Sequence, residues 1–103
     1  MKLRLSAAIV AAVAGAMFAG AAAAEPVVAK LQAGKGAAKP LAGGAVFECL
    51  GDVCAARAPA TDTPTLRGCK DLARQMGPVI SYGPASKPLS DEQIATCNGS
   101  AKK

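Results

Sequence analysis

The four cysteines are the residues whose type and spacing could support metal or redox chemistry in this 103-residue chain: Cys49, Cys54, Cys69 and Cys97. A four-cysteine zinc site is typically built from two closely spaced pairs, and a thioredoxin-type site needs two cysteines separated by two residues at a helix start. The sequence contains neither pattern. The spacing therefore favours structural disulfides, and we expect no metal site and no cofactor.

Acid–base and nucleophilic catalysis have little support in the sequence. The chain has no histidine, which excludes histidine acid–base chemistry and Ser-His-Asp triads. Asp91 and Glu92 are adjacent at the start of a predicted helix, where carboxylates stabilise the helix dipole. Ser81 and Ser90 have no base nearby in the sequence, and Tyr82 is expected to belong to the core. We therefore expect that the protein is not an enzyme and has no catalytic residues.

The N-terminus has the pattern of a cleavable signal peptide. Residues 1–4 are basic, residues 5–20 are apolar and uncharged, and Ala22 and Ala24 fit the small-residue positions before a cleavage site. We expect residues 1–24 to be removed after Ala24; an uncleaved membrane anchor is the alternative. The first cysteine is far from this site, which argues against a lipoprotein. The prediction is a periplasmic or secreted protein with no stable membrane insertion after cleavage, in a compartment that permits disulfides.

The charge of +5 and the composition bear on possible partners. Residues 45–98 hold five basic and six acidic side chains, so the positive charge lies in the tails. The chain has no tryptophan, one tyrosine and two phenylalanines. Nucleic-acid binding requires a basic face with aromatic side chains for stacking, so we expect no nucleic-acid partner. The partner itself is unknown, and an envelope protein or polymer is the natural class to consider.

Composition divides the rest of the chain into three parts. Residues 25–44 are rich in alanine, glycine and spaced lysines, which predicts a flexible linker; removal of residues 25–42 should change stability little. Residues 45–99 form the expected disulfide-stabilised domain. Residues 100–103 are a short basic tail.

The first element of the expected domain is a β-hairpin over residues 45–58. Gly51 and Asp52 form a two-residue turn, and this register places Cys49 opposite Cys54 in a non-hydrogen-bonded pair. Cα atoms in such a pair are close enough for a disulfide. The predicted bridges are therefore Cys49–Cys54 and, by elimination, Cys69–Cys97. Glu48 and Arg57 fall on a cross-strand diagonal of the same hairpin.

A helix, a strand and a second helix are expected to follow the hairpin. Thr63 can cap the first helix, with Pro64 at its first position, and Gly77 with Pro78 ends it. The strand spans residues 79–82, with Ile80 and Tyr82 on one face. Ser90 and Gln93 form a capping box for the second helix, Leu89 and Ile94 have hydrophobic-staple spacing, and Asn98-Gly99 closes it.

These elements predict an α+β fold of the order β-β-α-β-α with a flexible N-terminal arm. A right-handed crossover would place the strand at residues 79–82 beside the first strand of the hairpin.

The run AGGAVFECLGDVC, the single cysteine in a helix and the late segment SDEQIATCN resemble a small exported alphaproteobacterial four-cysteine family of unknown function. The resemblance implies export and a small disulfide-bonded domain, and it implies no activity. The first functional hypothesis is thus a non-enzymatic binding or structural domain of the cell envelope or exterior. The second is a thiol–disulfide redox protein that uses Cys49 and Cys54. A protease-inhibitor module that presents loop 58–64 or 83–88 is a third.

Overall fold

The computed structural model describes residues 25–101. The predicted signal peptide and the last two residues of the basic tail lie outside this range. The elements are β1 (Val27–Leu31), β2 (Leu41–Ala42), β3 (Ala45–Val46), β4 (Glu48–Leu50), β5 (Val53–Ala56), α2 (Leu66–Met76), β6 (Val79–Gly83) and α3 (Asp91–Asn98). The fold is α+β with two disulfides, as the sequence predicts.

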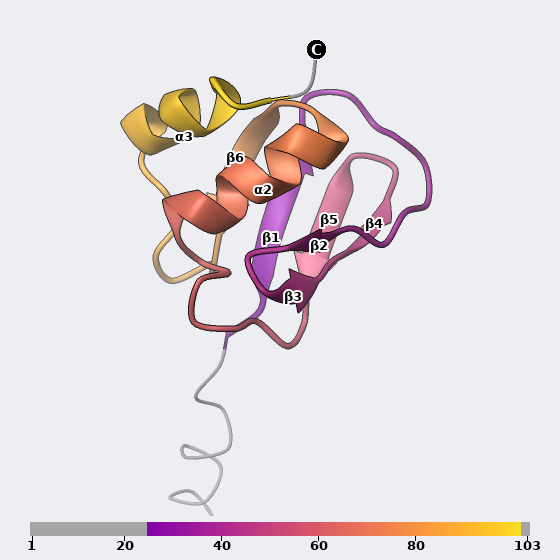
Figure 1. The fold of residues 1–103 in the computed structure, drawn as a ribbon, viewed down its shortest axis with the longest axis horizontal. Helices are drawn as coiled ribbons and strands as arrows, with labels where there is room; N and C mark the ends of the chain where they lie inside the picture. The colour runs from indigo at the N-terminus through magenta and orange to yellow at the C-terminus, as the bar shows by residue number, and fades with distance from the viewer. Residues whose placement is uncertain (1–24, 102–103) are drawn as a thin grey trace, which may run out of the picture.

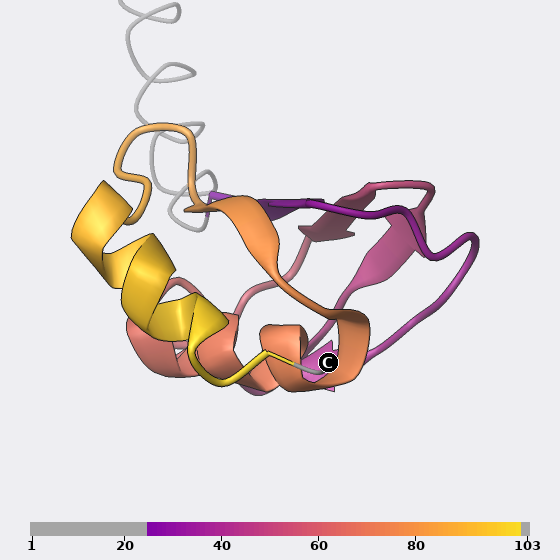
Figure 2. The ribbon, with the colours of Figure 1, turned by 90° about the horizontal axis from the view of Figure 1, so that it is seen from above.

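The main sheet is antiparallel and has the strand order β4-β5-β1-β6. Strands β2 and β3 form a separate two-stranded ribbon. Helix α2 and this ribbon cover one face of the main sheet, and α3 lies alongside α2 and β6 (Figures 1 and 2). The opposite face of the sheet carries no helix among the described residues.

The predicted flexible linker over residues 25–44 is wrong, because it contains the central strand β1. This strand pairs with β5 on one side and β6 on the other. Val27, Ala29 and Leu31 are at most 1% exposed, whereas Val28 and Lys30 point to the opposite face. Two-residue alternation in VVAKL is a strand signal, but the surrounding alanines, glycines and lysines obscured it. The folded domain therefore includes these residues.

The predicted strand order is also wrong, for the same reason. We expected the strand at residues 79–82 to lie beside the first strand of the hairpin. Instead β1 lies between the hairpin and β6, so both of its neighbours are antiparallel to it. Strands β5 and β6 therefore run parallel to each other, and the crossover through α2 leaves one strand position between them, which β1 fills.

The hairpin forms with the predicted register. Glu48, Cys49 and Leu50 pair with Ala55, Cys54 and Val53, respectively. Gly51 has a φ of 66°, in the left-handed region that glycine adopts without a steric cost. The first strand is interrupted at Phe47, whose backbone N–H donates to Pro40 O (2.8 Å). The two residues before it pair with β2 rather than with β5.

Helix α2 begins two residues later than predicted. Its N-cap is Thr65, whose hydroxyl accepts a hydrogen bond from Gly68 N, and the helix ends before Gly77 as expected. Thr63 is fully buried, donates from Oγ1 to Gly43 O (2.8 Å) and accepts from Ala60 N (2.7 Å). Its side chain therefore fixes the loop before α2 to the β2–β3 turn and is not available as a helix cap.

Strand β6 contains an irregularity that separates two residues predicted to share a face. The pairing with β1 shifts between Lys30 and Leu31, so that Ser81 pairs with Lys30 but Val79 pairs with Leu31. One extra residue in a strand changes the side-chain alternation beyond it. Tyr82 is consequently buried (1% exposed), whereas Ile80 is 56% exposed.

Helix α3 begins with the predicted capping box. The backbone N–H of Gln93 donates to Ser90 Oγ (3.2 Å), and the backbone N–H of Ser90 donates to Gln93 Oε1 (3.0 Å). Leu89 and Ile94 are partly buried and pack against the core. Cys97 is the buried residue of this helix.

Candidate functional site

Both disulfides connect the cysteines that the hairpin register predicts. Cys49 and Cys54 join β4 to β5 with Cα atoms 4.0 Å apart, and Cys69 and Cys97 join α2 to α3 with Cα atoms 5.9 Å apart. Cys49 is 5% exposed, and the other three cysteines are fully buried. Thiol–disulfide exchange requires access of a thiolate to a sulfur atom, so neither bridge is open to exchange while the domain is fully folded.

The other residues considered for chemistry lie apart in the fold. Asp91 and Glu92 are exposed in the first turn of α3. The hydroxyl of Ser90 accepts the hydrogen bond from Gln93 N that forms part of the capping box. Ser81 lies on the exposed side of β6 opposite Lys30. Within residues 25–101, no group of three or more potential metal-ligating side chains comes together.

Tyr82 lies in the core, as the sequence predicts, and is 1% exposed. Its hydroxyl donates a hydrogen bond to the carbonyl oxygen of Thr63, and its ring lies 6.1 Å from that of Phe47, measured between centroids. Burial, together with the negative charge of Asp71, raises the pKa of Tyr82 well above its ordinary value of about 10. The phenol therefore remains protonated and acts as a structural donor.

The side of the sheet that no helix covers carries several exposed apolar side chains. We call it the open face and define it by the outward-pointing residues of β1, β4 and β5 with Arg57 at the end of β5: Val28, Lys30, Glu48, Leu50, Val53, Ala55 and Arg57. The strand register arranges six of them in two rows, Leu50–Val53–Lys30 and Glu48–Ala55–Val28. Leu50 is 77% exposed, Val28 44% and Val53 43%.

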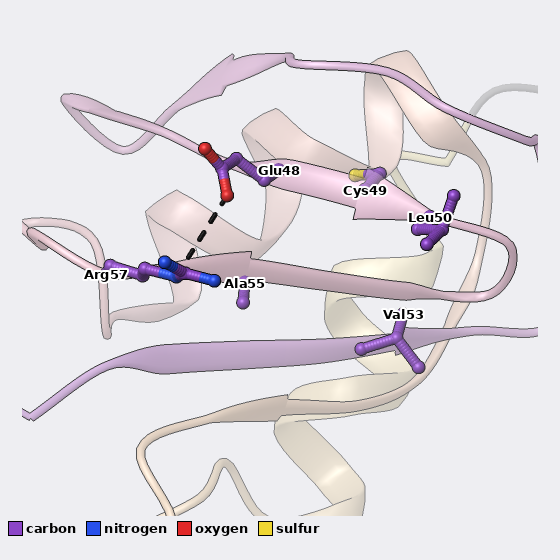
Figure 3. Close-up of a pocket in the computed structure, with 6 residues that line it drawn as sticks. All are labelled: Glu48, Cys49, Leu50, Val53, Ala55 and Arg57. Carbon is purple, nitrogen blue, oxygen red and sulfur yellow. Dashed lines mark ion pairs between the residues drawn. The ribbon is translucent and has the colours of Figure 1, made fainter.

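A shallow hollow of about 380 Å³ lies on the hairpin side of the open face (Figure 3). Its outward lining consists of Leu50, Val53 and Ala55 with the ion pair Glu48–Arg57 at one end. The Nε atom of Arg57 lies 4.0 Å from Oε1 of Glu48, and both side chains are largely exposed. An exposed pair at this distance contributes little to stability, so both groups remain available to other partners.

Sequence reasoning found the part of this surface that the hairpin contributes. The hairpin register predicted the Glu48–Arg57 pair, and the two-residue alternation of its strands puts Leu50 and Val53 on the same face. It missed Val28 and Lys30, because both lie in the segment interpreted as a linker. The available signal was the alternation of residues 27–31, which places these two side chains opposite the buried ones.

A second hollow of about 460 Å³ adjoins loop 84–89 and is lined mainly by prolines, Leu89, Lys87 and Gln93. Ser86 of this loop donates from its backbone N–H to Glu25 Oε2 (3.1 Å) and from its hydroxyl to Glu25 Oε1. These contacts join the loop to the segment that leads into β1.

Comparison with known proteins identifies one match. A family model described as a family of unknown function (DUF8200) matches residues 8–99. No curated protein and no solved structure matches the chain. Within the part of the chain that the structure describes, no helix is long and apolar enough to cross a membrane.

Proposed function

The chain belongs to the DUF8200 family of unknown function, and from this premise we propose that it is an exported, non-enzymatic domain that binds an envelope protein through its open face. The partner contributes an apolar segment that carries acidic side chains. The four cysteines of the sequence form two disulfides, which are typical of proteins in a non-reducing compartment. The signal-peptide pattern of residues 1–24 supports export.

The observation that carries this proposal is the apolar surface of the open face. Leu50, Val53 and Val28 are large apolar side chains, all more than 40% exposed; Leu50 and Val53 are paired across the hairpin, and Val28 lies diagonally across from Val53. Contiguous exposed apolar residues with polar neighbours are characteristic of protein interaction sites. A rigid sheet also presents them without the entropy cost of ordering a loop on binding.

The charges of the open face indicate the kind of partner. Lys30 lies next to Val53 in the register, and the side chain of Arg57 is 84% exposed. Glu48 is the acidic residue of this face, so the two basic groups outnumber it. An arginine fork can bind a carboxylate with two hydrogen bonds, which favours a partner with acidic side chains next to apolar ones.

The binding proposal is tested by affinity capture from envelope extract, using the exported protein and two open-face variants, Leu50→Asp and Arg57→Glu. We expect both variants to lose most of the partner that the wild type retains, and we expect retention to weaken as salt increases. Leu41→Asp is the matched control, because Leu41 is 63% exposed but lies on the β2–β3 ribbon. Equal retention by all four proteins would exclude the open face as the binding surface.

Export is tested separately by measuring the intact mass of the protein recovered from the periplasm or medium. The expected mass is that of a chain that begins at Glu25 with four oxidised cysteines. A mass that includes residues 1–24 would contradict cleavage and support the membrane-anchor alternative.

A further inference from the structure

Strand β6 forms one edge of the main sheet, and residues 89–98 form hydrogen bonds with three of its backbone groups. The backbone N–H of Val79 donates to Asn98 Oδ1 (2.8 Å), and Asn98 Nδ2 donates to Val79 O (2.9 Å). The backbone N–H of Leu89 donates to Tyr82 O (2.9 Å). The amide of Asn98 thus takes the place of a neighbouring strand, and the segment runs beside β6 (Figure 2).

The attachment of this segment depends heavily on one disulfide. Helix α3 has eight residues, of which Cys97 is buried and Ile94 is partly buried. A helix of this length is not stable by itself in water. The bridge from Cys97 to Cys69 in α2 therefore provides much of what holds α3, and Asn98 with it, against the domain.

The two edges of the sheet are protected differently. Strand β4 carries the charged Glu48, and the backbone N–H and C=O of Cys49 both bond to Ala38. Strand β6 has the sequence VISYG, with no charged residue and with side chains that favour strands. Edge strands usually avoid unwanted pairing through charges, prolines or a covering segment. For β6 within the described structure, the covering segment is residues 89–98.

We propose that α3 is a releasable cover of the β6 edge, and that reduction of Cys69–Cys97 exposes this edge to the same edge of a second copy of the chain. The reductant is a dithiol. It transfers two electrons and two protons to the bridge, so that Cys69 and Cys97 become thiols while the dithiol becomes a disulfide. Because both cysteines are buried, the exchange follows local opening of α3.

A second copy fits the exposed edge for three reasons. Two identical strands can pair antiparallel about a two-fold axis, which satisfies the same backbone groups in both chains. The absence of charge in β6 means that two copies do not repel each other along the strand. Pro78 and Pro84 flank the strand and confine the new pairing to five residues, since proline has no N–H to donate.

The first experiment compares two paired variants of the exported protein by sedimentation at increasing concentration. Cys69→Ser with Cys97→Ser removes the bridge that holds α3, and Cys49→Ser with Cys54→Ser is the matched control that keeps it. We expect the mass of the first variant to double with concentration, while the control and the oxidised wild type remain monomeric. If both variants dimerise, or neither does, the proposal is overturned.

Hydrogen exchange of the Val79 amide provides an independent measurement. At a concentration where the Cys69/Cys97 variant is monomeric, this amide should exchange about tenfold faster or more than in the wild type, and dimerisation should slow it again. Unchanged exchange would show that α3 remains in place without the bridge. Fast exchange at every concentration would show that no second copy pairs with β6.

If the Cys69/Cys97 variant does not fold, Asn98→Ala with both disulfides intact tests the cover directly. It removes both hydrogen bonds to Val79 and leaves α3 attached. We expect faster exchange of the Val79 amide, and an unchanged rate would overturn the role of Asn98 as the edge cover.

Discussion

Gly68 in α2 packs tightly against Tyr82 and the loop that precedes the helix. A Cβ atom at this position would lie 2.7 Å from the Tyr82 hydroxyl oxygen and still closer to the carbonyl oxygen of Thr63. Glycine costs a helix interior about 1 kcal/mol relative to alanine, so its presence here reflects the space available rather than helix propensity. The helix and Tyr82 can approach each other because residue 68 has no side chain.

Gly68→Ala should therefore lower the free energy of unfolding by about 1–3 kcal/mol, despite the better helix propensity of alanine. Urea denaturation measures the change. Arg67→Ala, at an exposed position of the same helix, is the control and should stay within about 0.5 kcal/mol of the wild type. A Gly68→Ala protein as stable as the wild type would show that the core can accommodate the methyl group.

Ionisation of Tyr82 should make the free energy of unfolding depend on pH in the alkaline range. Burial raises its pKa in the folded state, whereas the unfolded chain releases the proton near pH 10. Above pH 10 the unfolded state therefore binds fewer protons than the folded state, and stability falls as pH rises. Below pH 10 both states keep the proton, so Tyr82 adds no pH dependence there.

Thermal unfolding of the wild type should show this loss of stability between pH 9 and about pH 11.5, a range that spans the ordinary tyrosine pKa of roughly 10. Tyr82→Phe should be less stable at pH 9 by about 1 kcal/mol, through the lost hydrogen bond to Thr63, and should lose less stability above pH 10. Parallel pH profiles for the two proteins would contradict this role of Tyr82.

At the scale of elements, β1 changes the expected effect of mutations near residue 30. A linker would tolerate substitution, but Leu31 is 1% exposed in the central strand. Leu31→Ala should lower the free energy of unfolding by about 2–5 kcal/mol, because it removes buried methyl groups and leaves a cavity. The neighbouring Lys30→Ala, on the open face, should change it by less than about 0.5 kcal/mol.

Chemical denaturation of these two variants distinguishes the strand from a linker. Equal stabilities for Leu31→Ala, Lys30→Ala and the wild type would show that β1 contributes nothing to the folded domain. The same reasoning reverses the expectation that residues 25–42 could be removed with little effect.

At the scale of the whole molecule, the two disulfides constrain the chain to different extents. They close loops with sequence separations of 5 and 28 residues. Loop-entropy estimates give about 2 kcal/mol for Cys49–Cys54 and about 3.5 kcal/mol for Cys69–Cys97, before any native strain is subtracted. Cys69→Ser with Cys97→Ser should thus destabilise the protein more than Cys49→Ser with Cys54→Ser.

Denaturant midpoints of the two paired variants measure this difference at a protein concentration where both are monomeric. The use of paired serines avoids a free thiol in either protein. A greater loss in the Cys49/Cys54 variant would show that the hairpin, rather than α3, limits stability.

The hypothesis of a redox protein that uses Cys49 and Cys54 also depends on the whole fold, because the fold determines whether a thiol can reach the two sulfur atoms. Burial of Cys49 and Cys54 predicts a reduction potential for this bridge below about −300 mV, the range of structural disulfides. Equilibration of the purified protein with a thiol–disulfide buffer measures it. A potential near −200 mV or above would instead favour a redox function.

Only part of the open face could be predicted from the sequence. The hairpin turn, the Cys49–Cys54 register and the Glu48–Arg57 pair are local, and all three could be predicted. The rest of the open face, Val28 and Lys30, depends on β1, whose alternation is short and lies among residues typical of linkers. Its assignment required the two strands that pair with it, and both come later in the chain.

What the sequence determined by itself is the part of the fold governed by interactions over a few residues. The hairpin turn, the capping box of α3 and the end of α2 depend on backbone conformation and hydrogen bonds between near neighbours, which residue type controls directly. The tertiary structure alone decided the position of β1, the irregularity in β6 and the role of Thr63. In each case a partner distant in sequence determines which side chain is buried, because burial depends on the surface that another segment supplies.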